Sequence, residues 1–180
     1  MAALIEAARD PAYPAQIVGV FSNVPDAPGL ATAASYGIPT AWRWHKDYPS
    51  RIGFELAIGD VLKLWRPDFI ALAGFMRMLT PEFARKWQGR MINIHPSLLP
   101  AFPGLHTHEQ ALAAGVAEHG CTVHFVTAGM DEGPTILQAR VPVEPGDTAA
   151  TLAARVLTEE HRIYPQALAM LARGEATFPA

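Results

Sequence analysis

The stretch DFIALAGFMRMLTPEFARKWQGRMINIHPSLLP, residues 68–100, decides the fold of this chain. Its apolar run at 68–73 predicts a buried strand, and Thr80-Pro81 predicts a helix that begins with proline in its first turn. A second apolar run at 91–94 predicts another strand, which ends in the turn Asn93 to Pro100. Two buried strands connected through a helix favour a parallel sheet, with both carboxyl ends at one edge.

The same alternation of strands and helices continues on the amino-terminal side of this stretch. Each predicted strand is a short apolar run that ends in turn residues, and each predicted helix has apolar residues at helical spacing. The pattern predicts a single α/β domain with an open, mainly parallel, Rossmann-like sheet. Strands are predicted at 17–21 and 38–42, and helices at 2–9, 28–36 and 50–65.

Ligands of open parallel sheets bind beyond the carboxyl ends of the strands. Three loops of this chain lie at such ends, namely Ser22-Asn23, the loop 74–79 and the turn 93–100. We therefore expect these three loops to be neighbours in space.

The last third of the chain has a different pattern. Two strands are predicted at 119–126 and 134–143. They are expected to pair antiparallel across a turn that contains Asp131-Glu132-Gly133-Pro134, because a short turn of this kind connects neighbouring antiparallel strands.

Two helices flank this strand pair. His106 is predicted to begin a short helix that reaches Ala114. The segment 148–171 is predicted to form a long helix, with Asp147 as its cap and Pro165 as a point where it could be interrupted.

Composition and charge exclude several classes of partner. The 180 residues carry a net charge of −3 with a pI near 6.1, so there is no electrostatic reason to expect a nucleic acid or an acidic membrane surface. No apolar run approaches the roughly 20 residues of a membrane span. The single cysteine, Cys121, excludes an internal disulfide and any multi-cysteine zinc site. Its strand context predicts a buried thiol, and a reducing cytoplasm is the expected location.

Asn93, His95 and Asp131 form the candidate reaction centre. Histidine titrates near working pH and suits general acid and base catalysis. A carboxylate from Asp131 would favour the protonated imidazole. The amide of Asn93 can donate a hydrogen bond to an oxygen that gains negative charge when a carbonyl is attacked. These three roles describe the attack of an amine on an acyl carbon.

Several of these residues also have a purely structural interpretation. A lone histidine in a loop is structural more often than catalytic, and Asp-Glu-Gly-Pro is commonly just a turn. His106 and His108 have a spacing that permits two metal ligands, although a helix start and local hydrogen bonds explain them too. His124, inside an apolar strand, fits a satisfied histidine of the core or one that supports other groups. Arg77, in an apolar loop, needs an anionic or carbonyl partner, either a local acid or a ligand.

Seven motifs, spread nearly end to end over the chain, match one known family. They are Phe-Ser-Asn at 21–23, Leu-Ala-Gly-Phe-Met-Arg at 72–77, Asn-Ile-His-Pro-Ser-Leu-Leu-Pro at 93–100, Phe-Pro-Gly-Leu-His-Thr-His at 102–108, Val-His-Phe-Val-Thr at 123–127, Asp-Glu-Gly-Pro at 131–134 and Glu-His-Arg-Ile-Tyr-Pro at 160–165. These motifs resemble those of phosphoribosylglycinamide formyltransferase, the folate-dependent transformylase of purine biosynthesis.

The resemblance implies transfer of the formyl group of 10-formyltetrahydrofolate to the amine of glycinamide ribonucleotide, without a metal. Asn93, His95 and Asp131 match the family's catalytic asparagine, histidine and aspartate. Glu160 matches a glutamate that contacts the substrate. The folate-contacting segments of the family fall on Arg51, Met76, Arg77, Met78, Leu79, Asn93, Thr127, Ala128, Gly129, Met130 and Asp131.

Two related families share the Asn-x-His core. Methionyl-tRNA formyltransferase typically has Arg-Gly-Ala where this chain has Pro103-Gly104-Leu105, and it also has a basic carboxy-terminal domain. Formyltetrahydrofolate deformylase has an additional regulatory domain, and it remains an alternative because hydrolysis uses the same three residues with water in place of the amine. A truncated, catalytically silent folate-binding chain is a further alternative. The oligomeric state is left open.

The family begins with a strand and a Gly-x-Gly-Ser-Asn loop that holds the substrate phosphate, directly before a helix that resembles residues 1–9. This chain begins inside that helix, so about a dozen residues are missing by the usual lengths of strands and loops. The missing strand would be central, and its absence would leave the neighbouring strands with unpaired backbone groups. We therefore expect one formyltransferase domain, 1–180, that is truncated at its amino terminus relative to the family, and a natural protein that is longer. If the chain does start at Met1, we expect weak binding of the substrate phosphate and poor stability, while the catalytic trio persists.

Overall fold

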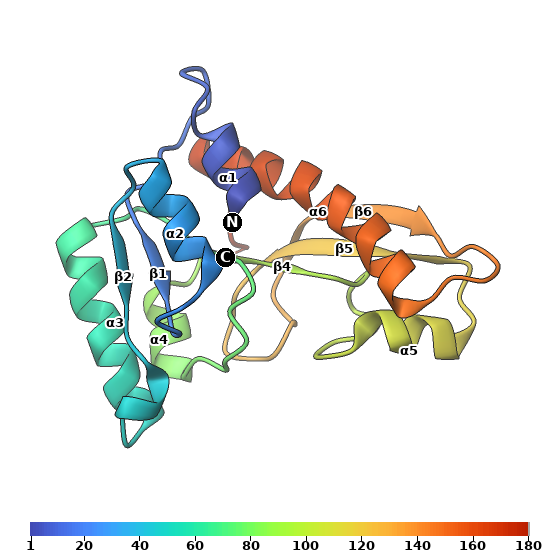
Figure 1. Ribbon diagram of the computed structural model, residues 1–180, viewed down its shortest axis with the longest axis horizontal. Coiled ribbons are helices and arrows are strands. Elements are labelled where there is room, and N and C mark those ends of the chain that lie inside the picture. Colours follow the sequence, from blue (N-terminus) through green and yellow to red (C-terminus); the bar gives the residue numbers. More distant parts are fainter. Residues whose placement is uncertain (180) are drawn as a thin grey trace.

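Six strands form two sheets in the computed structural model, which describes residues 1–179 (Figure 1). The smaller sheet contains β1 (Val20–Ser22) and β2 (Thr40–Trp42), which pair in parallel. The larger sheet contains, in spatial order, β3 (Ile70–Leu72), β4 (Met91–His95), β5 (Glu118–Phe125) and β6 (Thr135–Pro142). β3 and β4 are parallel, whereas β5 is antiparallel to both of its neighbours.

The predicted α/β class is confirmed, with parallel pairs early in the chain and an antiparallel pair in the last third. The strands are divided over two sheets, however, whereas a single sheet was predicted. Within the described residues, the backbone of β1 pairs only with the β2 segment, as in the hydrogen bonds from Val20 N–H to Pro39 and from Arg43 N–H to Ser22. β3 pairs with β4 alone. The edges of β1 and β3 that face away from these partners therefore end the two sheets.

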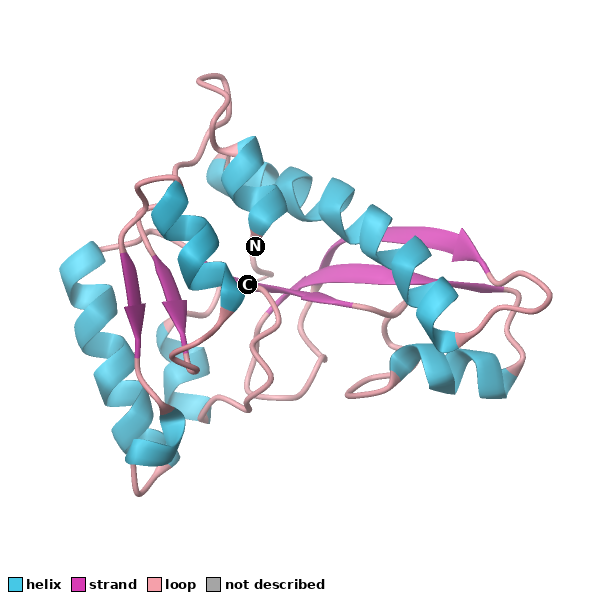
Figure 2. Cartoon of the chain, in the orientation of Figure 1, coloured by secondary structure: helices cyan, strands magenta, loops and turns pink. Residues whose placement is uncertain are grey.

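Helices cover both sheets and connect the strands (Figure 2). The longest, α6 (Ala149–Ala172), packs against β5 and β6, and α5 (Thr107–Ala114) packs beside α6. α1 (Ala2–Ala7) contacts both α6 and α2 (Pro28–Ser35). The remaining helices are α3 (Arg51–Trp65), α4 (Pro81–Lys86) and a short 3-10 helix at His45–Asp47.

The start of α6 differs from the prediction. Its cap is Thr148, whose side chain accepts a hydrogen bond from Thr151 N–H, while the Thr151 side chain accepts one from Thr148 N–H. Asp147 lies outside the helix and binds the guanidinium of Arg155 at 2.6 Å. The prediction of Asp147 as the cap was wrong, because its carboxylate is held by a stronger charged partner.

α6 also continues through Pro165 without interruption. Proline at this position removes the hydrogen bond to the carbonyl of residue 161. His161, the residue that carries this carbonyl, lies on the exposed face of the helix.

β4 lies between two apolar clusters. Met91 packs in the smaller cluster with side chains of α3 and α4. Ile92 packs in the larger cluster, which fills the space between the sheet and α6. Because side chains alternate along a strand, Asn93 and His95 face the same side as Met91. Burial on both faces makes β4 a firm support for the residues at its end.

Candidate active site

The end of β4 places Asn93 and His95 beside two other strands. The backbone register sets Asn93 opposite Leu72 of β3 and opposite His124 of β5. His95 follows on the same face and is only 5% exposed. The loop after β3 therefore starts beside Asn93, as the sequence predicted for the loop 74–79 and the turn 93–100.

The turn between β5 and β6 brings Asp131 to His95. The Oδ2 atom of Asp131 lies 3.4 Å from Nδ1 of His95 and accepts a hydrogen bond of 2.9 Å from Gly104 N–H. Asp131 itself has a left-handed backbone, with φ of 55°. A Cβ on Gly133 would lie 1.7 Å from the carbonyl oxygen of Phe125, so the turn requires glycine there. The Asp-Glu-Gly-Pro motif is thus a turn that aims a carboxylate.

The two nitrogen atoms of His95 have different partners. Nε2 lies 3.0 Å from the carbonyl oxygen of Phe102. Because a carbonyl oxygen can only accept, Nε2 carries the hydrogen and donates a hydrogen bond to that oxygen. In the neutral imidazole, Nδ1 is then unprotonated and faces the carboxylate of Asp131. That carboxylate would stabilise a proton taken up at Nδ1. This arrangement suits a group that receives a proton and passes it on.

His124 contacts both Asn93 and Asp131. Its Nδ1 donates to the carbonyl oxygen of Phe125 at 2.9 Å, which leaves Nε2 as an acceptor. Nε2 lies 3.4 Å from Nδ2 of Asn93 and 3.7 Å from Oδ1 of Asp131. Burial lowers the pKa of His124, and the Phe125 carbonyl and the Asp131 carboxylate only partly oppose this, so the imidazole stays neutral. Neutral His124 therefore holds one N–H of the Asn93 amide and leaves the other available.

The residues matched to folate contacts lie on separate elements. Arg51 is the first residue of α3 and is exposed. In the loop after β3, Met76 and Met78 are 76% and 45% exposed. Arg77 is also exposed and forms no ion pair within residues 1–179, so a local salt bridge does not explain it. Residues 127–130 follow β5 and lead directly into the turn that carries Asp131.

Glu160 and Asn23 lie on other elements, α6 and the loop after β1. Burial raises the pKa of Glu160 on α6, and the amino-terminal ammonium group partly opposes that rise. Asn23 follows β1 in the smaller sheet, where its Nδ2 lies 3.2 Å from Nδ1 of His45. Within the described chain, neither Glu160 nor Asn23 forms a hydrogen bond with Asn93, His95 or Asp131. The predicted neighbourhood of the loop after β3 and the turn after β4 is confirmed by the pairing of Leu72 with Asn93. The loop Ser22-Asn23 follows Phe21, which packs against the same apolar cluster as Phe75 and Leu79 of the loop after β3.

Two further histidines, His108 and His119, pack against each other. His119 is fully buried, and its Nε2 lies 3.2 Å from Nδ1 of His108. Burial, and to a lesser extent the neighbouring His108, lower the pKa of His119 to about 4. No group of three or more His, Cys, Asp or Glu side chains among residues 1–179 is arranged to hold a metal ion. Cys121 is buried as predicted, and burial raises the pKa of its thiol to about 12.

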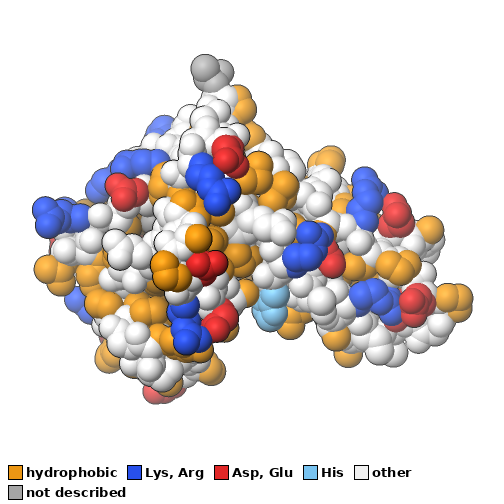
Figure 3. Space-filling view, turned by 90° about the horizontal axis from the view of Figure 1, so that it is seen from above, with side chains coloured by type: hydrophobic (Ala, Val, Ile, Leu, Met, Phe, Trp, Pro, Cys, Tyr) orange, Lys and Arg blue, Asp and Glu red, His pale blue; other side chains and the backbone are white. Residues whose placement is uncertain are grey.

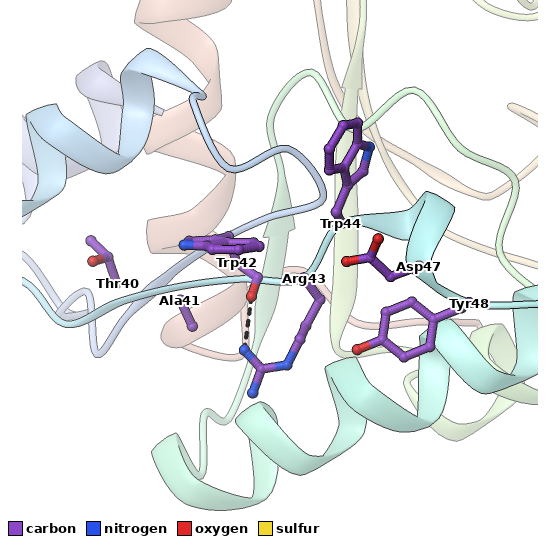
Figure 4. Close-up of a pocket in the computed structure, with 7 residues that line it drawn as sticks. All are labelled: Thr40, Ala41, Trp42, Arg43, Trp44, Asp47 and Tyr48. Carbon is purple, nitrogen blue, oxygen red and sulfur yellow. Dashed lines mark hydrogen bonds between the residues drawn. The ribbon is translucent and has the colours of Figure 1, made fainter.

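A surface hollow of about 500 Å³ lies along β2 and contains none of the candidate site residues (Figure 4). Two exposed indoles, Trp42 and Trp44, line it together with Tyr48. The guanidinium of Arg43 turns back onto the carbonyl of Trp42 at 2.8 Å. On the face shown in Figure 3, Lys and Arg side chains lie beside Asp and Glu side chains rather than forming one basic surface.

The sequence profile of formyl transferases matches residues 1–168. The chain belongs to the formyl transferase family. Among its curated relatives is phosphoribosylglycinamide formyltransferase of Escherichia coli, which is 46% identical over 172 residues, or 96% of this chain and 81% of the relative. The trifunctional purine biosynthetic protein adenosine-3 of Drosophila pseudoobscura is 53% identical over 96% of this chain, and the human protein of the same name is 51% identical over the same share.

Solved structures of similar formyl transferases share this fold. Glycinamide ribonucleotide transformylase 1 from Symbiobacterium toebii has a TM-score of 0.95 at 45% identity, covering 99% of this chain and 84% of the other. Phosphoribosylglycinamide formyltransferase from Brucella melitensis has a TM-score of 0.91 at 54% identity, covering 98% and 91%.

The lengths of the relatives differ widely. This formyl transferase chain spans 13% of the Drosophila protein and 17% of the human protein. Among the helices described for residues 1–179, none has the length and apolar character needed to cross a membrane.

Proposed function

We propose that this formyl transferase moves the formyl group of 10-formyltetrahydrofolate to the amine of glycinamide ribonucleotide, giving formyl-glycinamide ribonucleotide in purine biosynthesis. The observation that carries the proposal is the placement of Asn93, His95 and Asp131 in one connected network at the end of β4. The names of the single-function relatives support the same substrates. We assign the reaction to the cytoplasm and to small-molecule partners alone, with no metal.

Each of the three residues has one role in the formyl transfer. The amine nitrogen attacks the formyl carbon, a new C–N bond forms, and the carbonyl oxygen gains negative charge. The free N–H of the Asn93 amide stabilises that oxygen. Nδ1 of His95 receives the proton lost by the amine and returns it to N10 of the folate as the old C–N bond breaks. The carboxylate of Asp131 balances the charge on the imidazole meanwhile.

We propose that the residues that match the family's binding segments bind the two substrates. The Arg51 guanidinium suits a carboxylate of the folate glutamate, because its donors match carboxylate geometry. The exposed thioethers of Met76 and Met78 suit a flat ring. Arg77, Leu79 and residues 127–131 complete the folate contacts, and Glu160 contacts glycinamide ribonucleotide.

Hydrolysis is the competing reaction, because water can replace the amine in the same network. An assay that follows both formyl-glycinamide ribonucleotide and free formate separates the two. Formate release that does not depend on the amine would identify a deformylase. Folate binding without either product would identify a catalytically silent chain.

His95→Ala tests the proton-transfer role. The rate should fall by roughly 10²–10⁴-fold, the usual contribution of a general acid or base. His161→Gln, on the exposed face of α6, is the matched control and should keep the wild-type rate. Activity close to wild type in His95→Ala would refute the assignment.

A further inference from the structure

Glu55 is a buried carboxylate that the proposed chemistry does not use. It lies on α3 and is 6% exposed. Burying a carboxylate is costly unless hydrogen bonds compensate for the lost water. No ion pair with Glu55 occurs within the described residues 1–179, so its partners must be neutral donors.

Both oxygen atoms of Glu55 accept hydrogen bonds from a single residue. Oε1 accepts from Thr80 N–H at 2.6 Å, and Oε2 accepts from the Thr80 hydroxyl. Thr80 is also the cap of α4, where its side-chain oxygen accepts from Phe83 N–H. Hydrogen bonds to a charged acceptor are the strong ones, so this bidentate contact firmly joins α3 to the start of α4.

The contact fixes one end of the loop 73–79. The other end is fixed at Leu72, which pairs with Asn93 in the sheet. Within the loop, Phe75 and Leu79 pack against the smaller apolar cluster, whereas Met76 and Met78 point outward. Glu55 therefore sets where the loop presents its exposed thioethers.

Arg51 lies four residues, about one helical turn, before Glu55 on α3. Side chains at this spacing are neighbours on the helix surface. The Glu55–Thr80 contact thus sets the position of the loop relative to Arg51. We propose that Glu55 is a positioning residue that holds the two halves of the folate site in register. The inference rests on the proposed function, because that function assigns Arg51 and the loop to folate.

The kinetic test compares Glu55→Ala with wild type. Loss of both hydrogen bonds should raise the KM for 10-formyltetrahydrofolate by roughly tenfold, as expected for charged hydrogen bonds. The kcat and the KM for glycinamide ribonucleotide should remain close to wild type, which a general loss of stability would not produce. Thr80→Ser, which keeps both donors, should behave like wild type.

Glu82→Ala is the matched control, because Glu82 is an exposed glutamate on α4 that pairs with Arg85. It should leave both KM values unchanged. If Glu55→Ala fails to fold, Glu55→Gln replaces it, with a smaller rise in the folate KM. A wild-type folate KM in a folded Glu55 variant would overturn the inference while leaving the proposed function intact.

A second measurement does not need activity. Trypsin cleaves after arginine, and Arg77 lies at the exposed part of the loop. Cleavage at Arg77 should be clearly faster in Glu55→Ala than in wild type or Glu82→Ala. Equal cleavage rates would overturn the inference. An inactive wild type would instead count against the proposed function.

Discussion

At the scale of single residues, hydrogen-bond direction determines what the site can do. His124 donates from Nδ1 to a carbonyl, so only its Nε2 is left to accept from Asn93. His95 donates from Nε2 to Phe102, so only its Nδ1 is left for the carboxylate of Asp131. Each imidazole thereby has one fixed tautomer, assigned by its backbone partner.

His124→Phe should separate orientation of the Asn93 amide from proton transfer. Phenylalanine keeps the ring but removes the acceptor, so the amide is free to rotate. We expect the kcat to fall by roughly tenfold to a hundredfold, less than the loss of an oxyanion donor itself. Steady-state kinetics with both substrates will show this. An unchanged kcat in the folded variant would mean that Asn93 is oriented by other contacts.

At the scale of elements, close approach of backbones shapes the turn between β5 and β6. A side chain on Gly133 would overlap the carbonyl of Phe125, which is the last residue of β5. The turn carries Asp131 on one side of this contact, so its path decides where the carboxylate lies.

Gly133→Ala should therefore affect both stability and activity. The alanine methyl group can fit only if the turn moves. We expect this to lower the free energy of unfolding by about 1–3 kcal/mol. The rate of formyl transfer should fall as well, because Asp131 moves with the turn. Urea unfolding and kinetics together measure both effects.

Gly59→Ala is the control for this experiment. A Cβ there meets no atom within 4 Å, and the site is inside α3. We expect alanine to stabilise the protein by about 0.5–1 kcal/mol, because it restricts the unfolded chain and favours the helix. Equal destabilisation by both substitutions would contradict the role of close approach at Gly133.

Much of this element-level structure could be predicted from the sequence. The strand at 91–94 and its polar end follow from a local apolar run and its turn residues. The contact between Asp131 and His95 was expected from their chemistry, because a carboxylate would favour the protonated imidazole. The cap of α6 was missed because Asp147 and Thr148 are both good caps, and only the position of Arg155 decides between them.

The partners of His124 could not be predicted from the sequence in detail. Its place opposite Asn93 depends on the register between β4 and β5, and a shift of one residue would turn its side chain to the other face. The division into two sheets depends in the same way on pairing between distant strands. Neither β1 nor β3 carries a local signal for which strand lies beside it.

At the scale of the whole molecule, the buried His119 couples stability to pH. Its pKa is about 4 in the folded state, against about 6.5 for an unperturbed histidine. The unfolded state therefore binds the proton more readily between these two values. The contribution of His119 to the free energy of unfolding is complete at pH values above the pKa of the unfolded state. It is lost as the pH falls towards the pKa of the folded state.

The expected loss from His119 is about 2 kcal/mol between pH 7 and pH 5. Urea unfolding of wild type and His119→Gln at both values isolates this contribution, because the glutamine does not titrate. The variant should lose less stability than wild type on acidification. Parallel losses in the two proteins would show that His119 is not responsible.

The two sheets should also differ in their local stability. β1 is half-exposed and pairs with a single strand, whereas residues 119–125 of β5 are buried and pair on both sides. We expect the amides of Val20 and Arg43, which bond across β1 and β2, to exchange with solvent clearly faster than those of β5. Native-state hydrogen exchange measures this directly. Uniform protection in the two sheets would show that they open as one unit.

The division into two sheets also determines which part of the molecule each spectroscopic signal reports on. All four tryptophans, Trp42, Trp44, Trp65 and Trp87, come before β4. Two of them, at the end of β2 and just after it, are exposed. No indole lies in the segment that contains β5, β6 and α6. Intrinsic fluorescence and its quenching by iodide will thus report chiefly on the part built around the smaller sheet, α3 and α4. Circular dichroism follows all the helices, of which α6 is the longest, so a mismatch between the two signals would reveal the parts melting separately.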